Sequence, residues 1–331
     1  MKELIRGLLT VSGGSGNEGG VAAAIKAQVS GVADEVFTDI LGNLFAIKRP
    51  KGAGSGKTVM LIAPMDEPSV VITDIGENGY LRFEPLGRLQ ASALIGARVR
   101  VGRTGRLGVI GVESKADHAH LEFQHLFIDL RTADAASAAA YAQVGDTATF
   151  AYGMEELDDH TVIGHALGSR AACVVQIEAF KNANSSATIV AVFSSQAQVG
   201  SRGAQVAAYR IRPDLAVAID ISPTGDTPEA KRISLTLGGG AGIKALDRDM
   251  VVAPAIREQL SRAAVKAEIT AQIEVSPQAH SEAGAVFLSR EGIPTGGVAI
   301  PVRYADTLSQ MADLRDMTAC VQVLEAFLSD L

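Results

Sequence analysis

The sequence predicts an α/β fold in which a helix-covered sheet is interrupted by a smaller β-rich module. Three strand-length apolar runs without alternation, at 59–63, 188–194 and 215–219, are typical of strands buried on both faces of a largely parallel sheet. Helical patterns lie between and after these runs, and this alternation favours an α/β/α layered sandwich. Short Val-, Ile- and Gly-rich segments separated by turn residues fill the region from 70 to 162 and predict the β-rich module.

The individual elements follow from the same patterns. Helices are expected over 169–182, 203–209, 255–267, 281–291 and 316–331, and an Ala-rich helix is expected over 133–143. The strands of the module are expected at 70–75, 80–85, 98–101, 108–112, 125–129 and 147–150. We therefore expect a discontinuous α/β domain, made of 1–68 and 163–331, with residues 69–162 inserted between its halves.

Composition narrows the function classes. The 331 residues are 47% apolar and carry a formal net charge of −7 with scattered Lys and Arg, so neither nucleic acid nor an anionic membrane is an expected partner. The N-terminus has charges in its first turn and no long apolar run behind it, which argues against a signal peptide. The two cysteines, Cys173 and Cys320, lie far apart in apolar settings and favour a reducing compartment. We expect a cytoplasmic protein.

Two local patterns resemble chemical motifs but fit structural roles better. The Gly-rich stretch 52–58 has Lys51 where a phosphate-binding loop needs its first Gly, and it precedes a strand, so a surface hairpin is expected. The histidines His118, His120 and His125 alternate with acids, which is typical of a solvated edge, with a metal site as the alternative. The sequence has no Gly-x-Ser-x-Gly turn, and no histidine is recognisable as the base partner of a serine. A serine hydrolase is therefore not favoured.

Acidic residues follow several predicted strands. Asp66 and Glu67 follow the first apolar run, Asp220 follows the third, and Asp306 follows a strand-like segment at 297–301. Ligands of α/β sheets bind at the carboxyl ends of the strands. Acids gathered there repel one another unless they are protonated or neutralised, which makes them candidate metal ligands. Helix capping and loop solvation remain the structural alternative.

At these positions the sequence resembles the tetrahedral aminopeptidases, relatives of glutamyl aminopeptidase with two zinc ions. The resemblance runs nearly end to end. It is carried by Ser15-Gly-Asn-Glu18, Asp39-Ile-Leu-Gly-Asn43, Met65-Asp66-Glu67, Leu126-Phe-Ile-Asp129, Val199-Gly-Ser-Arg-Gly-Ala204, Gly225-Asp-Thr-Pro228, Asp247-Arg248, Ala283-Gly-Ala285, Arg290-Glu-Gly-Ile-Pro294, Ile300-Pro-Val-Arg-Tyr304 and Asp313-Leu-Arg-Asp316. It implies an α/β catalytic domain with an inserted β-barrel-like dimerisation domain, and dimers that assemble into hollow twelve-subunit particles.

The sequence differs from the family at the positions where the resemblance implies metal ligands and a general base. Pro64 stands where the family has a metal-binding His, and Gly168 stands where it has the bridging Asp. Ala197 and Gln198 replace the Glu that acts as general base and the Glu that binds metal, and Asp306 replaces the last His. Without a bridging anion, two dications about 3.5–4 Å apart would repel strongly.

Two family positions are kept. Asp220 matches a metal ligand, and Asp66 matches the Asp that steadies the missing His. We therefore expect a catalytically impaired or inactive homologue, without a catalytic residue at Ala197 and without a required cofactor. It would form a homo-oligomer and bind a peptide or small molecule.

Two alternatives stay open. The first is a rewired hydrolase with one divalent metal at Asp220 and Asp306, completed by Asp66 or Glu282, with His165 or His280 close enough to act; oxygen ligands would favour magnesium, calcium or manganese. The second is a purely structural oligomer subunit.

Overall fold

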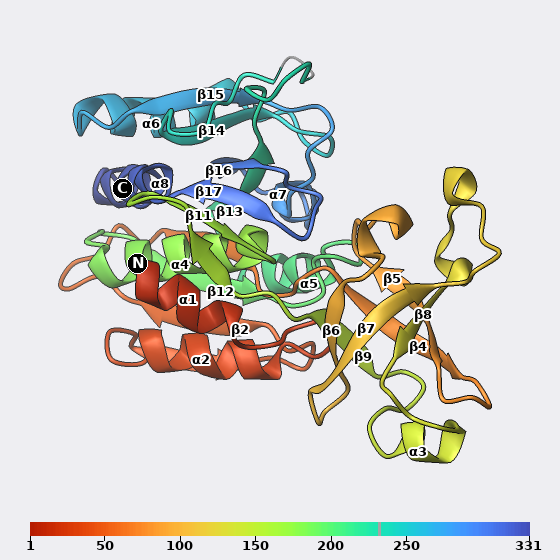
Figure 1. Cartoon of the computed structure of the whole chain (residues 1–331). Helices are drawn as coiled ribbons and strands as arrows, with labels where there is room; N and C mark the ends of the chain where they lie inside the picture. Colours follow the sequence, from red (N-terminus) through yellow and green to blue (C-terminus); the bar gives the residue numbers. More distant parts are fainter. Residues whose placement is uncertain (231–232) are drawn as a thin grey trace.

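The computed structural model describes residues 1–230 and 233–331, and they form a large sheet with helices beside a closed barrel (Figure 1). The large sheet runs in the order β1 (Glu35–Thr38), β2 (Leu44–Lys48), β12 (Thr188–Ser194), β3 (Thr58–Pro64), β13 (Leu215–Pro223), β16 (Thr295–Arg303), β17 (Gln310–Asp313), β11 (Thr161–Gly164) and β10 (Met154–Glu156). β14 (Ala241–Leu246) branches from this path, pairing with both β16 and β15 (Ala271–Val275).

The centre of this sheet is parallel and its edges are antiparallel. The strands β12, β3, β13 and β16 are joined by parallel pairings, whereas β1, β2, β17, β11 and β10 pair antiparallel. The three apolar runs predicted as buried strands are β3, β12 and β13, so the prediction of an α/β fold is confirmed. Their side chains are buried on both faces, which is why the runs do not alternate.

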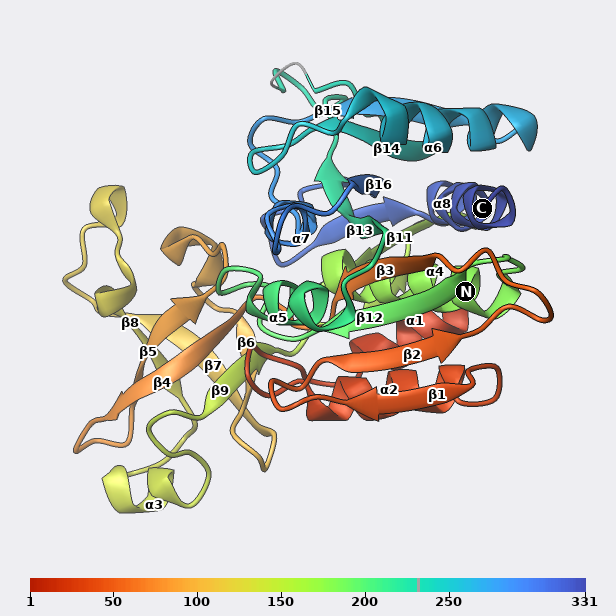
Figure 2. The same ribbon diagram turned by 180° about the vertical axis from the view of Figure 1, so that it is seen from behind.

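Helices α1 (Lys2–Leu9), α2 (Gly19–Val29) and α4 (Leu167–Asn182) cover one face of the sheet, in front of the strands in Figure 1 and behind them in Figure 2. The buried helix α4 packs on β3 and β13 and also contacts α8 (Leu314–Ser329). α6 (Pro254–Lys266) packs on α8 and β14, whereas α5 (Arg202–Ile211) and α7 (Ala283–Phe287) contact each other at the end of the sheet near the barrel.

The inserted region forms a closed six-stranded barrel with its own apolar core. Its strand order is β4 (Ser69–Ile75), β5 (Leu81–Leu86), β8 (Leu126–Asp129), β7 (Arg106–Val112), β6 (Arg98–Val101) and β9 (Thr147–Phe150). All six predicted strands lie in it, and α3 (Ala135–Ala139) is a shorter helix than predicted. β10 and β11 pair with the large sheet, although the division drawn from the sequence groups 154–162 with the barrel.

The helix predicted over 281–291 is restricted to the five residues of α7. Before α7, the side chains of Ser281 and Glu282 bond to other segments. Ser281 Oγ donates to Asp247 Oδ2 at 2.5 Å, and Glu282 Oε2 accepts from Ser194 Oγ at 2.6 Å. After it, Gly292 adopts a φ of 99°, a left-handed conformation that glycine tolerates without a Cβ clash. Contacts with other segments therefore limit this helix at both ends.

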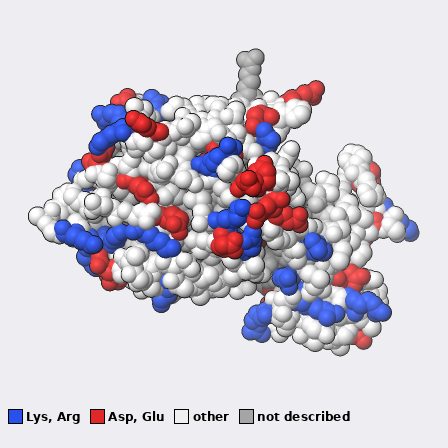
Figure 3. Space-filling model, turned by 60° about the vertical axis from the view of Figure 1, so that its left-hand side comes forward, with Lys and Arg blue, Asp and Glu red and all other residues white. Residues whose placement is uncertain are grey.

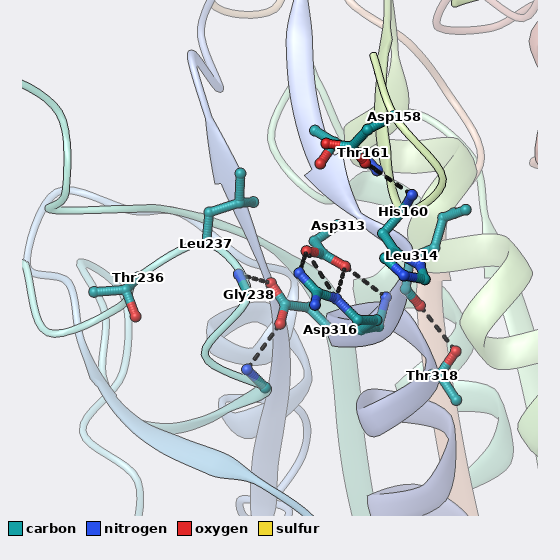
Figure 4. Close-up of polar contacts among 12 residues, drawn as sticks. Asp158, His160, Thr161, Thr236, Leu237, Gly238, Asp313, Leu314, Asp316 and Thr318 are labelled. Carbon is teal, nitrogen blue, oxygen red and sulfur yellow. Dashed lines mark hydrogen bonds and ion pairs between the residues drawn. The ribbon is translucent and has the colours of Figure 1, made fainter. Parts of the chain in front are cut away.

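The start of α8 is fixed by two aspartates (Figure 4). Asp313 caps the helix by accepting from Arg315 N at 2.8 Å, and it also pairs with the Arg315 guanidinium at 2.6 Å. Asp316 accepts hydrogen bonds from Gly238 N at 2.8 Å and Gly240 N at 2.7 Å. We call Asp313, Arg315 and Asp316 the α8 cap cluster, and it ties the turn before β14 to the last helix.

On the face shown in Figure 3, Lys and Arg are intermixed with Asp and Glu over the large sheet and its helices. This pattern lacks the continuous positive stripe that nucleic-acid binding requires. In the part of the chain that the structure describes, every helix is too short or too polar to traverse a lipid bilayer.

Candidate functional site

The candidate site is a crevice of about 580 Å³ at the carboxyl ends of the central strands. Its lining comes from the ends of β3 and β13, the start of α4, the 197–201 turn, and the 278–282 loop before α7. Pro68 and Arg88, from the barrel side, also line it. Parallel strands in α/β sheets place ligand sites at this edge. All five positions where the sequence departs from the family pattern, Pro64, Gly168, Ala197, Gln198 and Asp306, lie along this crevice.

Pro64 is the last residue of β3 and is fully integrated in the sheet. It lies opposite Ser194 in the parallel pairing of β3 with β12. Its carbonyl oxygen accepts from the thiol of Cys173, with a sulfur-to-oxygen distance of 3.1 Å. The pyrrolidine ring has no donor atom to offer to a metal ion.

Gly168 lies at the start of α4, where its neighbours already fill the space beside it. Its N–H donates to Gln310 Oε1 at 2.8 Å, and a Cβ placed on Gly168 would lie 3.0 Å from Ile221 Cδ1. A carboxylate side chain at this position would therefore require Ile221 to move.

The turn that contains Ala197 and Gln198 is held by two buried acids. Asp66 accepts from Ala197 N and Gln198 N, both at 2.9 Å, and from Ser15 Oγ at 2.6 Å. Glu18 accepts from Gln196 N at 2.8 Å. Burial raises the pKa of Asp66 to about 6, against the opposing effect of these donors. Asp66 thus anchors this turn.

The side chain of Gln198 extends away from the strand ends. A Cβ on Gly87 would lie 2.7 Å from Gln198 Oε1, so the amide lies against the backbone that follows β5. This glycine also has a φ of 95°, and it leaves room for the glutamine between the barrel and the large sheet.

Glu67, the second acid after β3, belongs to a buried ion pair. It accepts from Arg170 Nη2 at 2.9 Å and from Gly13 N at 2.7 Å, and His165 Nε2 lies 3.4 Å from its other oxygen. Burial by itself raises the pKa of Glu67, but Arg170 and His165 bring it below the ordinary value. His165 also packs edge-on against Phe150, and it lies outside the lining of the crevice. The Glu67 carboxylate is therefore occupied by contacts within the protein.

Asp220 and Glu282 line the crevice and, unlike Asp66 and Glu67, each has a single hydrogen-bond donor among the described residues. Asp220 accepts only from Ile221 N at 2.8 Å, and Glu282 accepts only from Ser194 Oγ, among the hydrogen bonds of the described residues. Burial raises the pKa of Asp220 to about 7 and raises that of Glu282 well above its ordinary value. Glu282 Oε1 is buried with no hydrogen-bond partner among the residues described. A buried carboxyl oxygen without a partner is energetically unfavourable, which makes Glu282 and its neighbour Asp220 candidates for contacting a ligand.

Asp306 reaches the same crevice from the loop after β16 and is exposed. The structure therefore brings Asp220, Asp306 and Glu282 to one cavity, whereas Asp66 and Glu67 are occupied by backbone and arginine donors. Within 1–230 and 233–331, no three His, Cys, Asp or Glu side chains are grouped so as to hold a metal ion.

The histidines of the barrel region lie at its surface. His118 and His120 form a short 3-10 turn, in which the His120 Nδ1 lies 2.9 Å from Asp117 Oδ2. His125 accepts from Glu122 N at 3.1 Å through its Nδ1. These local contacts match the solvated edge expected from the sequence.

The crevice also contains a series of three polar side chains in contact that is not predicted from the sequence. Ser201 Oγ lies 3.4 Å from His280 Nε2, and His280 Nδ1 contacts the Asp249 carboxylate. All three residues line the crevice. Ser201 and His280 are 79 residues apart, so no local sequence motif indicates that they are in contact. The only signal in the sequence is the Gly200-Ser201 step before a helix.

Comparison with known proteins gives consistent matches over the whole chain. The family model described as M42 glutamyl aminopeptidase matches residues 42–323. A protein of Acetivibrio thermocellus is 36% identical over 326 residues, covering 98% of this chain and 97% of its own length. The aminopeptidase APDkam598 of Desulfurococcus kamchatkensis superposes with a TM-score of 0.93 at 30% identity, covering 99% of this chain and 94% of its own.

An assembling peptidase is similar as well. The Pyrococcus horikoshii TET1 peptidase superposes with a TM-score of 0.89 at 25% identity, covering 100% of this chain and 99% of its own. That protein can assemble into a tetrahedron or a large octahedral shell.

Proposed function

Because the chain belongs to the M42 family of glutamyl aminopeptidases, we propose that it is a member without the metal-dependent peptidase reaction, which binds an amine-bearing ligand in its crevice. The observation that carries the proposal is the identity of the crevice residues. The positions at which the resemblance implies metal ligands and the general base hold Pro64, Gly168, Ala197, Gln198 and Asp306.

The donor set does not fit a pair of zinc ions. Pro64, Gly168 and Ala197 have no side-chain donor atom, and the amide of Gln198 is a neutral, weak ligand that extends toward Gly87. These residues also have roles of their own, because Pro64 O accepts from Cys173 and Gly168 N donates to Gln310. An alanine cannot take a proton from water, so the general base of the family reaction is missing.

Asp220 and Glu282 support a protonated amine as the recognised group. Glu282 is buried and Asp220 is partly buried, neither makes an ion pair with the described residues, and both line the same cavity. An ammonium group carries three donors and one positive charge, so it would pair with the carboxylates and satisfy Glu282 Oε1. A peptide N-terminus or a small amine has this chemistry.

The loss of peptidase activity is tested with purified protein, aminoacyl p-nitroanilides, and added zinc, cobalt or manganese. We expect no metal-dependent release of p-nitroaniline. A clear turnover that a chelator abolishes would overturn the proposal, and an M42 relative with measurable activity serves as the positive control in the same buffers.

Assembly is a second part of the proposal. The chain superposes over its full length on a peptidase that can assemble into a tetrahedron or a large octahedral shell, and this likeness supports a homo-oligomer, for which we propose dimers as the building unit and a dodecamer as one such assembly. Mass photometry at nanomolar concentration should give a multiple of the 34.4 kDa chain. A monomer throughout the concentration range would contradict this part and leave the crevice proposal intact.

A rewired hydrolase with one metal ion is the second candidate. It is favoured by the single observation that Asp220, Asp306 and Glu282 line one cavity. The oxygen donors would select magnesium, calcium or manganese over zinc. Elemental analysis after purification with these metals distinguishes the candidates, since one equivalent of bound metal supports the hydrolase and less than about a tenth of an equivalent supports the metal-free binding site.

A purely structural subunit is the third alternative from the sequence. It predicts that Asp220→Ala and Asp306→Ala leave both assembly and ligand binding unchanged, whereas the proposal predicts unchanged assembly and weakened binding for Asp220→Ala.

A further inference from the structure

The crevice contains a serine, a histidine and an aspartate in the order of a proton relay. Ser201 Oγ lies 3.4 Å from His280 Nε2, and the opposite ring nitrogen of His280 contacts Asp249 Oδ2. The carboxylate accepts from Nδ1–H, so it fixes the tautomer in which Nε2 is free to accept the serine proton. Serine-to-base contacts of this kind are often loose before substrate binds and tighten afterwards.

The backbone of Ser201 adopts a left-handed conformation directly before a helix. It has a φ of 53° and a ψ of 38°, and it lies between Gly200, with a φ of 110°, and the first residue of α5. A non-glycine residue in this left-handed region is held there by its surroundings, and such strain is concentrated at functional sites. Ser201 is 3% exposed, yet it lines the crevice, so its hydroxyl faces a sheltered cavity.

We propose that Ser201, His280 and Asp249 form a metal-free acyl-transfer centre that hydrolyses small carboxylic esters. Ser201 Oγ attacks the carbonyl carbon while His280 Nε2 takes the hydroxyl proton. The bond to the leaving alkoxide then breaks, and the alkoxide takes that proton from His280. Water attacks the acyl-serine with His280 again as base, which releases the acid and restores Ser201.

Each residue has a distinct part in this reaction. Ser201 and His280 are the catalytic residues because they touch the reacting atoms, whereas Asp249 is a positioning residue that acts through the imidazole. Positive potential at the start of the ten-residue helix α5 favours the negative charge that develops beside Ser201. Arg88 and Arg248, which also line the crevice, add positive charge on its wall.

This centre differs from the proposed amine site in both residues and chemistry. It uses neither Asp220 nor Glu282, and it does not depend on whether an amine binds. It also requires no metal, so it is compatible with the loss of the metal-dependent reaction.

A fluorophosphonate probe tests the proposal on the wild-type protein in the presence of a chelator. Ser201 Oγ would displace fluoride from phosphorus, and peptide mass spectrometry would locate the adduct on the peptide that contains Ser201. We expect stoichiometric labelling there, together with hydrolysis of p-nitrophenyl acetate. Ser201→Ala should abolish both, whereas Ser169→Ala should change neither, because Ser169 lines the same cavity and contacts Ala166 O and Arg170 instead of a histidine.

Two further variants test the relay. His280→Gln should reduce labelling and ester hydrolysis on the order of 100-fold or more. Asp249→Asn keeps the size of the side chain but reverses the favoured imidazole tautomer, so it should lower both rates while leaving the melting temperature unchanged. If Asp249 had a purely structural role, Asp249→Asn would lower the melting temperature and leave both rates unchanged.

The failure of this proposal is distinct from the failure of the amine site. No adduct on the Ser201 peptide, labelling spread over surface hydroxyls, or labelling unaffected by His280→Gln would each overturn the acyl-transfer centre. None of these results depends on amine binding, which is measured separately by calorimetry.

Discussion

The acids at the start of α8 are buried and well matched by donors, whereas Asp220 and Glu282 in the crevice each accept a single hydrogen bond from the described residues. Asp316 accepts from two backbone N–H groups and Asp313 accepts from Arg315, whereas Glu282 has one oxygen without a hydrogen-bond partner among the described residues. Burial raises the pKa in both regions, to about 6 for Asp316 and about 7 for Asp220.

This difference separates structural acids from candidate ligand-binding acids. A carboxylate that satisfies buried N–H groups contributes to stability, and its removal leaves those groups unpaired. A carboxylate that loses water on burial and gains few donors opposes stability, which makes it a candidate for a functional role. Asp66 belongs to the first class, because it accepts two hydrogen bonds from the turn at Ala197 and Gln198 and a third from Ser15 Oγ.

The largest expected effect is the loss of a structural acid. Asp316→Ala leaves Gly238 N and Gly240 N without their acceptor at the α8 cap cluster. We expect the free energy of unfolding to fall by about 3 kcal/mol, from two unpaired backbone donors. Urea denaturation followed by circular dichroism measures this change. A loss below about 0.5 kcal/mol would remove the distinction between the two regions.

The second expected effect is a gain in stability when Asp220 in the crevice is replaced. The folded pKa of Asp220, about 7, lies above its ordinary value of 3.8, so the folded state keeps a proton that the unfolded chain releases. The resulting stability is fully present below about pH 4 and is lost as the pH rises through 7. Asp220→Asn should therefore flatten the decline between pH 5 and 8 and stabilise the protein at pH 8 by about 2 kcal/mol.

The same denaturation series at pH 5 and pH 8 measures this effect. Asp74→Asn, which changes an exposed acid on β4, is the matched control and should behave as the wild type does. Destabilisation of Asp220→Asn at pH 8 would mean that this carboxylate supports the fold.

The smallest effect is expected within the α8 cap cluster itself. Arg315 pairs with Asp313 at 2.6 Å, but its side chain is 62% exposed. Solvent screening limits such pairs, so Arg315→Ala should change the stability by less than about 0.5 kcal/mol. The backbone cap from Arg315 N to Asp313 remains in the variant. A loss comparable to that of Asp316→Ala would show that the ion pair, and not the backbone bonds, secures this region.

The sequence predicts the fold better than the site for a physical reason. Buried central strands such as β3, β12 and β13 are recognisable because both faces require apolar side chains, and the strands of the barrel are bounded by turn residues. The strands β14, β15 and β17 are not predicted from the sequence, since segments of four to six residues carry little pattern.

Site contacts depend on where distant segments meet. The resemblance to the family located Pro64, Gly168, Ala197, Gln198 and Asp306 along one crevice, and strand-end reasoning located Asp220. Neither could pair Ser194 with Glu282, 88 residues away, or Ser201 with His280. Such pairs arise from the tertiary packing of the β12 to α5 turn against the loop before α7, which no local periodicity encodes.

Calorimetric titration of a dipeptide into chelator-treated protein tests the central claim most directly, namely that the crevice binds an amine without metal. We predict binding of the dipeptide with a free N-terminus, at least tenfold weaker binding of its N-acetylated form, and loss of this preference in the double variant Asp220→Asn with Glu282→Gln. Binding that appears only after zinc is added, or equal binding of the free and acetylated dipeptides, would contradict the account.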